Sequence, residues 1–237
     1  MIGVISMIRY LFVLLFLTSC NNLPIAYIQN FSSVNNVIFG FPENEITQEI
    51  FDDYEYSFIK MRFKRGPHSI LILSYINDDI YEWAGNDGVK IYTQNGRVIK
   101  TFGLTHDFEI LNPVTRTPEE VLAFNCDVNK RNIILDFFMD HKCNNGTFRS
   151  SERVNFYDPD LIAAPVRITF QKSSEVVKRL GKKSETQVLK EYISMPSIGW
   201  KKENNYYANL ETGVIEKSEQ FLHPRLPVAR VEFYYKY

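Results

Sequence analysis

Polar side chains at alternate positions of one segment near the C-terminus are the best candidates for binding chemistry. In residues 214–222, the carboxylate of Glu216, the hydroxyl of Ser218 and the amide of Gln220 share one face of an extended chain. Such donors and acceptors could bind the hydroxyl groups of a sugar. An exposed or edge strand would have the same appearance, because neither face of the segment is uniformly apolar.

Aromatic side chains that could stack against a sugar ring occur at Trp83, Trp200, Tyr206 and Tyr207. Together with the polar stripe, they predict a groove that binds glycan or a protein partner. The alternative is a glycan-modifying enzyme with Glu216 and a second carboxylate as acid and base. Its two carboxyl groups would lie about 5–9 Å apart across a cleft.

A different chemistry is indicated at the N-terminus, where Leu17-Thr18-Ser19-Cys20 follows Arg9 and an apolar run over residues 10–17. This is the order of a secretory signal. The run would span only about 12 Å as a helix, against the roughly 30 Å of a bilayer core. The segment is similar to the lipobox of bacterial lipoproteins, in which cleavage exposes a cysteine for acylation. An ordinary signal peptide that happens to carry a cysteine is the alternative.

Acylation of Cys20 would leave two cysteines, Cys126 and Cys143. In an oxidising compartment, a disulfide between them would close a loop of roughly 18 residues and contribute about 3 kcal/mol. Two free thiols are a second option. A metal site with His141 is a third, but the sequence lacks a paired C-x-x-C and a clear fourth ligand. We predict the disulfide and no metal.

Composition and motif content exclude several classes of function. The 237 residues carry 27 basic and 28 acidic side chains, so no cationic excess attracts nucleic acid. The sequence contains no nucleophile elbow, phosphate-binding glycine loop, zinc-protease motif or dinucleotide fingerprint. Its four histidines are scattered singly. We therefore predict a protein without cofactors or catalytic residues.

Two hairpin signals, Asp87-Gly88 and Asn95-Gly96, predict a three-stranded meander over residues 80–104. A two-residue turn at Asn95-Gly96 predicts four cross-strand pairs: Gln94 with Arg97, Thr93 with Val98, Tyr92 with Ile99, and Ile91 with Lys100. In this register, Lys100 lies on the core face with Val89, Ile91, Val98 and Phe102. It would be either a lysine at the rim or a cation inside a pocket.

Strand signals also occur at residues 56–64, 69–76, 166–172, 185–194, 205–209, 214–222 and 227–236. Thr117 is the expected cap of a short helix predicted over residues 117–124. Residues 133–139 and 175–180 could each be helix or strand. We predict a signal peptide over residues 1–19, a lipid-anchored tether over 20–44, and one β-rich domain over 45–237. Its fold is mainly antiparallel β, barrel- or sandwich-like, with one or two short helices.

Two groups of residues, in this order, resemble the YjbF/GfcB family of lipoproteins. The first comprises Trp83, Asp87-Gly88, Asn95-Gly96-Arg97-Val98, Lys100-Thr101 and Gly103-Leu104. The second comprises Glu191, Pro196, Asn205-Tyr206-Tyr207, Thr212-Gly213-Val214, Ser218-Glu219-Gln220, Pro224 and Pro227. The sequence departs from the family pattern at Tyr207, where Trp is usual, and in residues 125–145.

The resemblance implies an all-β fold, no catalytic residues, and a role in the assembly, secretion or control of capsule or exopolysaccharide. We therefore predict a non-enzymatic lipoprotein on the periplasmic face of the outer membrane of a Gram-negative bacterium, anchored through acylated Cys20. Asn21, rather than Asp, after the cysteine favours the outer membrane. The expected partners are polysaccharide, export proteins or both, and the expected contact residues are Trp83, Lys100, Tyr206, Tyr207, Glu216, Ser218 and Gln220. An envelope-stabilising protein without a ligand is a further alternative.

Overall fold

The structure is a computed structural model that describes residues 41, 45–111, 148–180, 182–210 and 212–236. All of these except Phe41 belong to one compact unit, residues 44–237. The elements in chain order are α3 (Gln48–Asp53), β1 (Phe58–Phe63), β2 (Ser69–Asn77), β3 (Ile80–Ala84), β4 (Lys90–Gln94), β5 (Arg97–Phe102), β6 (Phe108–Leu111), β7 (Phe148–Phe156), β8 (Leu161–Arg179), β9 (Lys182–Met195), the 3-10 turn η3 (Pro196–Ile198), β10 (Trp200–Asn209), β11 (Ile215–Gln220) and β12 (Ala229–Tyr234).

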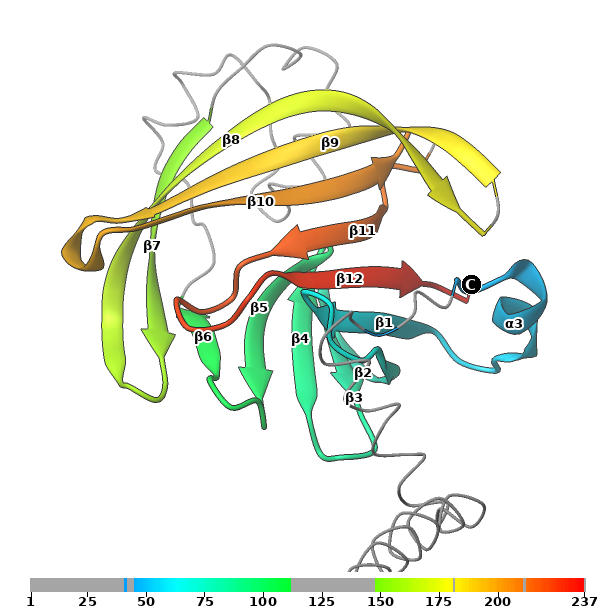
Figure 1. Cartoon of the computed structure of the whole chain (residues 1–237), viewed down its shortest axis with the longest axis horizontal. Coiled ribbons are helices and arrows are strands. Elements are labelled where there is room, and N and C mark those ends of the chain that lie inside the picture. Colours follow the sequence, from blue (N-terminus) through cyan, green and yellow to red (C-terminus); the bar gives the residue numbers. More distant parts are fainter. Residues whose placement is uncertain (1–40, 42–44, 112–147, 181, 211, 237) are drawn as a thin grey trace, which may run out of the picture. The chain divides into compact units, whose positions relative to one another are not determined.

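These strands form a closed antiparallel barrel (Figure 1). Each strand pairs with its neighbours in sequence, and β1 pairs with β12 to close the ring. Closure gives the first and last strands of the ring a partner on both sides. The predicted mainly antiparallel β fold is confirmed. Of the two forms left open, barrel and sandwich, the structure has the barrel.

Apolar side chains from alternate positions of the strands fill the interior of the barrel. Ile59 and Met61 of β1, Ile91 of β4 and Phe233 of β12 are each at most 4% exposed. Trp83 of β3 is fully buried among them. Its indole Nε1 donates a hydrogen bond to Thr93 Oγ1 at 2.8 Å, so the one polar atom of this side chain is satisfied without water.

The short helix α3 packs outside the ring, against β1 and β12. Thr47 caps it, because its Oγ1 accepts a hydrogen bond from the backbone N–H of Ile50. Phe51 of the helix lies 6.4 Å from the ring of Phe58 and 6.1 Å from that of Tyr234, and these two rings stack at 4.8 Å. The sequence analysis did not predict this helix.

None of the helices in the part of the chain that the structure describes combines the length and the hydropathy needed to cross a membrane.

The predicted turn between β4 and β5 is confirmed, with Asn95 at φ 51° and Gly96 at φ 77°. The pairs Gln94–Arg97 and Thr93–Val98 are also confirmed. Beyond them the predicted register is wrong, because a β-bulge in β5 leaves Ile99 unpaired.

The bulge pairs Tyr92 with Lys100 and Ile91 with Thr101. One extra residue exchanges the two faces of β5 after the bulge. Thr101 therefore turns inward in place of Lys100. Phe102, predicted in the core, is 60% exposed.

The remaining strand predictions agree with β1, β2 and β8 to β12 within a few residues at most ends, although β8 and β9 are longer than expected. Residues 175–180, left open between helix and strand, extend β8 as far as Arg179. β6 and β7 were not predicted. Cys20, Cys126 and Cys143, the helix at 117–124 and the segment at 133–139 lie outside the described residues, and these remain predictions.

Candidate functional site

The turn between β4 and β5 crosses the barrel interior and contacts the opposite wall. β11 lies six strands from β5 in either direction around the ring. Yet a Cβ atom added to Gly96 would lie 2.4 Å from the Cβ of Ile215 in β11. Two features therefore require glycine at position 96: the positive φ and the close approach to Ile215.

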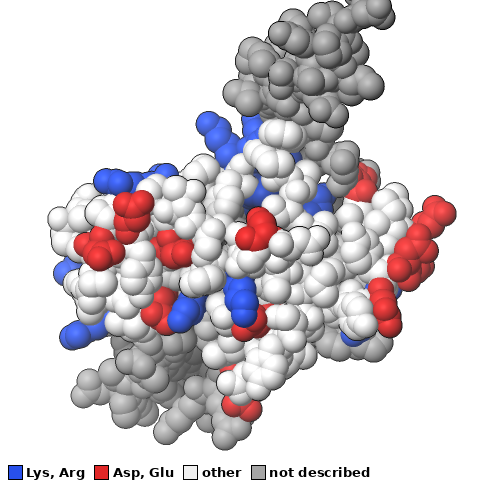
Figure 2. Space-filling model, turned by 90° about the horizontal axis from the view of Figure 1, so that it is seen from below, with Lys and Arg blue, Asp and Glu red and all other residues white. Residues whose placement is uncertain are grey.

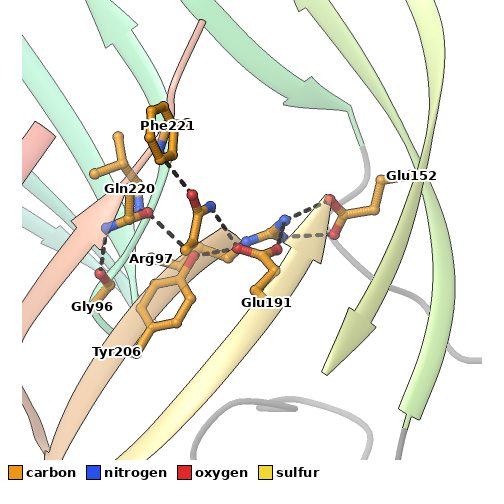
Figure 3. Close-up of polar contacts among 9 residues, drawn as sticks. Gly96, Arg97, Glu152, Glu191, Tyr206, Gln220 and Phe221 are labelled. Carbon is orange, nitrogen blue, oxygen red and sulfur yellow. Dashed lines mark hydrogen bonds and ion pairs between the residues drawn. The ribbon is translucent and has the colours of Figure 1, made fainter. Parts of the chain in front are cut away.

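Arg97, the next residue, carries the central charge of the interior. Its Nη1 and Nη2 atoms donate to the two carboxylate oxygens of Glu152 in β7 at 2.7 and 2.8 Å. Nη2 also donates to Oε1 of Glu191 in β9 at 2.6 Å. One guanidinium therefore holds two carboxylates from two different strands (Figure 3).

Glu191 extends this network to β10. Its second oxygen, Oε2, accepts hydrogen bonds from Tyr206 Oη at 2.5 Å and from Asn204 Nδ2 at 2.8 Å. The side-chain oxygen of Asn204 accepts the backbone N–H of Phe221 at 2.7 Å. The carboxylate of Glu191, which is fully buried, is thus surrounded by donors.

Gln220 of β11 binds the backbone of the crossing turn. Its Oε1 accepts the N–H of Val98 at 2.9 Å, and its Nε2 donates to the carbonyl of Gly96 at 3.0 Å (Figure 3). The same Nε2 donates to Ser218 Oγ at 2.8 Å. The amide thereby replaces the strand neighbour that the turn lacks at this point.

We call these seven side chains the interior polar cluster: Arg97, Glu152, Glu191, Asn204, Tyr206, Ser218 and Gln220. Each is at most 6% exposed. Burial opposes the charged form of Arg97, but the carboxylates of Glu152 and Glu191 outweigh it and raise the arginine pKa well above its ordinary value. Burial, and then the charge of Glu191, raises the pKa of Tyr206 well above its ordinary value, so the phenol stays a donor.

The cavity beside the interior polar cluster is small. It measures about 30 Å³ and is lined by Arg97, Glu152, Tyr206 and Gln220 on one side and by apolar side chains such as Phe108 on the other. That volume corresponds to about one water molecule. A sugar ring does not fit, so the chemistry of this cluster is to join strands across the barrel rather than to hold a glycan.

Four of the seven contact residues expected from the sequence lie inside the barrel. Trp83, Tyr206 and Ser218 are fully buried, and Gln220 is 1% exposed. The structure brings Tyr206, Ser218 and Gln220 together, as the strand pattern suggested, but on the inner face. Trp83 lines neither the small cavity nor the cluster.

The other three expected contact residues are separate from the cluster. Lys100 pairs with Glu109 at 2.9 Å, and this hydrogen bond raises the pKa of Lys100. Tyr207 is 8% exposed, and the Nζ of Lys217 lies 5.1 Å from its ring centroid.

Glu216 stands in a β-bulge of β11, where it accepts a hydrogen bond from Asn209 Nδ2 at 3.2 Å. The bulge interrupts the alternation, so Glu216 does not continue the row of Ser218 and Gln220.

Glu152 and Asn204 belong to the cluster but were not singled out from the sequence. Glu152 precedes Val154 and Phe156 at two-residue intervals, so a carboxylate occupies a position in an apolar row. Asn204 stands two residues before Tyr206, on the same strand face. In both cases the signal was a polar residue in register with core residues.

The outer surface carries both signs of charge. Figure 2 shows basic and acidic side chains interspersed among neutral areas on the face in view. Within the described ranges, no group of three or more His, Cys, Asp or Glu side chains is arranged to hold a metal ion.

The geometry defines a structural class: an up-and-down antiparallel barrel in which a buried arginine and two carboxylates link strands across the interior. The family described as "Group 4 capsule polysaccharide lipoprotein gfcB, YjbF" matches residues 31–233 of this sequence. The chain therefore belongs to the YjbF family, and the resemblance stated from the motifs is confirmed.

Two further proteins are similar to this chain, one in sequence and one in fold. The chain is 27% identical over 70 residues to an uncharacterized lipoprotein, YjbF, of Escherichia coli K12; the match covers 30% of this chain and 33% of that protein. The crystal structure of the hypothetical lipoprotein YmcC from Escherichia coli K12 has a similar fold, with a TM-score of 0.59 at 16% identity, covering 86% of this chain and 95% of that one. The likeness to YmcC shows a shared fold, and the family itself is shown by the match over residues 31–233.

Proposed function

We propose that this protein is a non-enzymatic lipoprotein that supports the assembly or export of capsule or exopolysaccharide. It would be anchored in the outer membrane through acylated Cys20 and face the periplasm. The observation that carries the proposal is the family match over residues 31–233, whose description combines a lipoprotein with capsule polysaccharide. The sequence Leu17-Thr18-Ser19-Cys20 supplies an acylation site in keeping with it.

The structure supports a binding or scaffolding role. Two charged residues of the family pattern, Arg97 and Glu191, are buried and hydrogen-bonded to each other. A general acid or base must reach the substrate atom that it protonates or deprotonates. These groups cannot do so while the barrel is closed, so we assign them to stability.

The anchor is tested with two variants in the native host. Cys20→Ser is expected to lose labelling by radioactive palmitate, to leave the membrane fraction and to reduce surface polysaccharide. Asn21→Asp, the control, is expected to retain the label but to move from the outer to the inner membrane. A Cys20→Ser protein that still carries label would refute the anchor.

The role itself is tested by deleting the gene and measuring surface polysaccharide by immunoblot and uronate content. Loss of surface polymer, restored by the wild-type gene, is the expected result. A pull-down of the acylated protein from envelope extracts is expected to recover polysaccharide or an export protein. Normal surface polymer in the deletion strain would contradict the proposal.

A further inference from the structure

A groove on the outer wall of the barrel carries the chemistry that the interior polar cluster cannot offer to a polymer. It lies over β8, β9 and β10, measures about 720 Å³, and is lined chiefly by Arg167, Thr169, Tyr192, Ser194, Lys201 and Glu203. None of these residues belongs to the motifs that carried the family resemblance. We propose that this groove binds an acidic polysaccharide, which names the substrate class and rests on the proposed function for the choice of a glycan.

Strand pairing places the groove residues in two adjacent rows on one face. Arg167, Ser194 and Lys201 face one another across the three strands. Thr169, Tyr192 and Glu203 form the next row, two residues along each strand, and side chains two apart point to the same face. The inward neighbour Ile168 is 1% exposed, which assigns the two rows to the outer side.

The charges of the groove favour an anion. Arg167 and Lys201 are exposed, and among the described residues neither has a carboxylate within ion-pair distance. Glu203 is paired with Lys190 at 3.3 Å, so its charge is offset locally. Arg167 and Lys201 stand on β8 and β10, two strand spacings or about 10 Å apart along their row. A polymer that carries several carboxylates along its chain can contact both cations at once.

The neutral groups of the groove favour a sugar over a simple anion. The hydroxyl of Ser194 lies between the two cations, and that of Thr169 lies two residues from Arg167 on β8; both can exchange hydrogen bonds with ring hydroxyls. Tyr192 is 37% exposed, so part of its ring is available for stacking. The volume lies within the range of about 300–1,000 Å³ typical of binding sites.

The test measures binding of the acylated full-length protein, held in detergent micelles, to polygalacturonate and to uncharged dextran. The double variant Arg167→Ala/Lys201→Ala is compared with Arg65→Ala/Arg225→Ala, which removes two exposed cations elsewhere. Two exposed charge pairs together contribute about 1.4 kcal/mol, so the groove variant should bind polygalacturonate about tenfold more weakly. The control variant should bind within about twofold of wild type, and wild-type binding should weaken as salt rises.

A second pair of variants isolates the stacking contribution. Tyr192→Ala is expected to weaken binding severalfold, while Tyr75→Ala, which removes a tyrosine that is 63% exposed on β2, should not. The proposal is overturned if the wild type does not bind polygalacturonate, or if both double variants weaken equally. Preferential binding to phosphatidylglycerol vesicles, lost in the groove variant, would overturn it in favour of a lipid surface.

Failure of the groove is distinguishable from failure of the proposed function. The deletion strain is complemented with the Arg167→Ala/Lys201→Ala gene and scored for surface polysaccharide. We expect poor complementation at normal protein abundance. Full complementation, together with unchanged polygalacturonate binding, would discard the groove while leaving the capsule role intact. A deletion strain with normal surface polymer would instead discard the role.

Discussion

The substitution Arg97→Met tests whether the interior polar cluster stabilises the barrel. It removes the guanidinium that donates three hydrogen bonds, at 2.6–2.8 Å, to the carboxylates of Glu152 and Glu191. Both carboxylates are at most 4% exposed, so neither can recover the lost interaction from bulk water. Removing one partner of a buried ion pair costs about 3–5 kcal/mol. In a domain of this size, that corresponds to a fall in melting temperature of about 6–20 °C.

The assay is urea unfolding of the full chain in detergent, followed by tryptophan fluorescence. Arg153→Met is the matched control, because Arg153 is the exposed neighbour of Glu152 on β7. It should change the unfolding free energy by less than about 0.5 kcal/mol. If Arg97→Met also stays within about 1 kcal/mol of wild type, the reasoning about buried charge is refuted.

Removing the two carboxylates as well gives an independent check of the Arg97→Met result. Adding Glu152→Gln and Glu191→Gln should recover part of the loss.

Three further predictions follow from single contacts. Gly96→Ala should destabilise the protein by about 2–5 kcal/mol in urea unfolding, because its Cβ would clash with Ile215 and the positive φ adds a further cost. Gly88→Ala, at φ 81° with open space around it, should lose only about 1–2 kcal/mol. Equal losses in the two variants would contradict the clash. Burial, and then a neighbouring histidine, lowers the pKa of His223 to about 4. The folded state therefore binds fewer protons than the unfolded chain, and stability should be lost as the pH falls from 6.5 toward 4. His223→Gln should flatten this pH dependence of stability, and an NMR titration of His223 with a midpoint near 6.5 would contradict the prediction. Lys100→Met should lower stability by less than about 1 kcal/mol, because its ion pair with Glu109 is partly exposed. A loss above about 2 kcal/mol would contradict this.

The hairpin of β4 and β5 shows how far local signals reach. Asn95-Gly96 predicted the turn and its first two pairs correctly, because that geometry depends on the dihedral angles of two residues. The bulge at Ile99 has no local signature in the sequence. It depends on packing against the rest of the barrel, and it moved Lys100 and Phe102 away from their predicted places.

The polar stripe on β11 shows a different limit. The alternation correctly placed Ser218 and Gln220 on one face, but alternation alone does not say whether a polar face turns to water or to a partner inside the protein. The partners of Gln220 are the backbone atoms of Gly96 and Val98, more than 120 residues away in the chain. Such long-range pairing arises only when the barrel closes. The sequence analysis therefore inferred a binding groove where the protein has an internal hydrogen-bonded cluster.

The buried position of the polar stripe shows that the family pattern explains the fold of the barrel but not its ligand. Gly96, Arg97, Glu191 and Gln220 match the pattern, and all of them fasten the interior of the barrel. A match at these positions is therefore an argument for the same fold, and it carries little information about the ligand. If the two functions are separable, Arg97→Met should lower stability without altering the preference for polygalacturonate over dextran. Arg167→Ala with Lys201→Ala should instead reduce that preference about tenfold at unchanged stability. A single variant that changes both properties together would show that the groove depends on the interior fastening, because the outer rows of β8, β9 and β10 would then hold their shape only while Glu191 is bound.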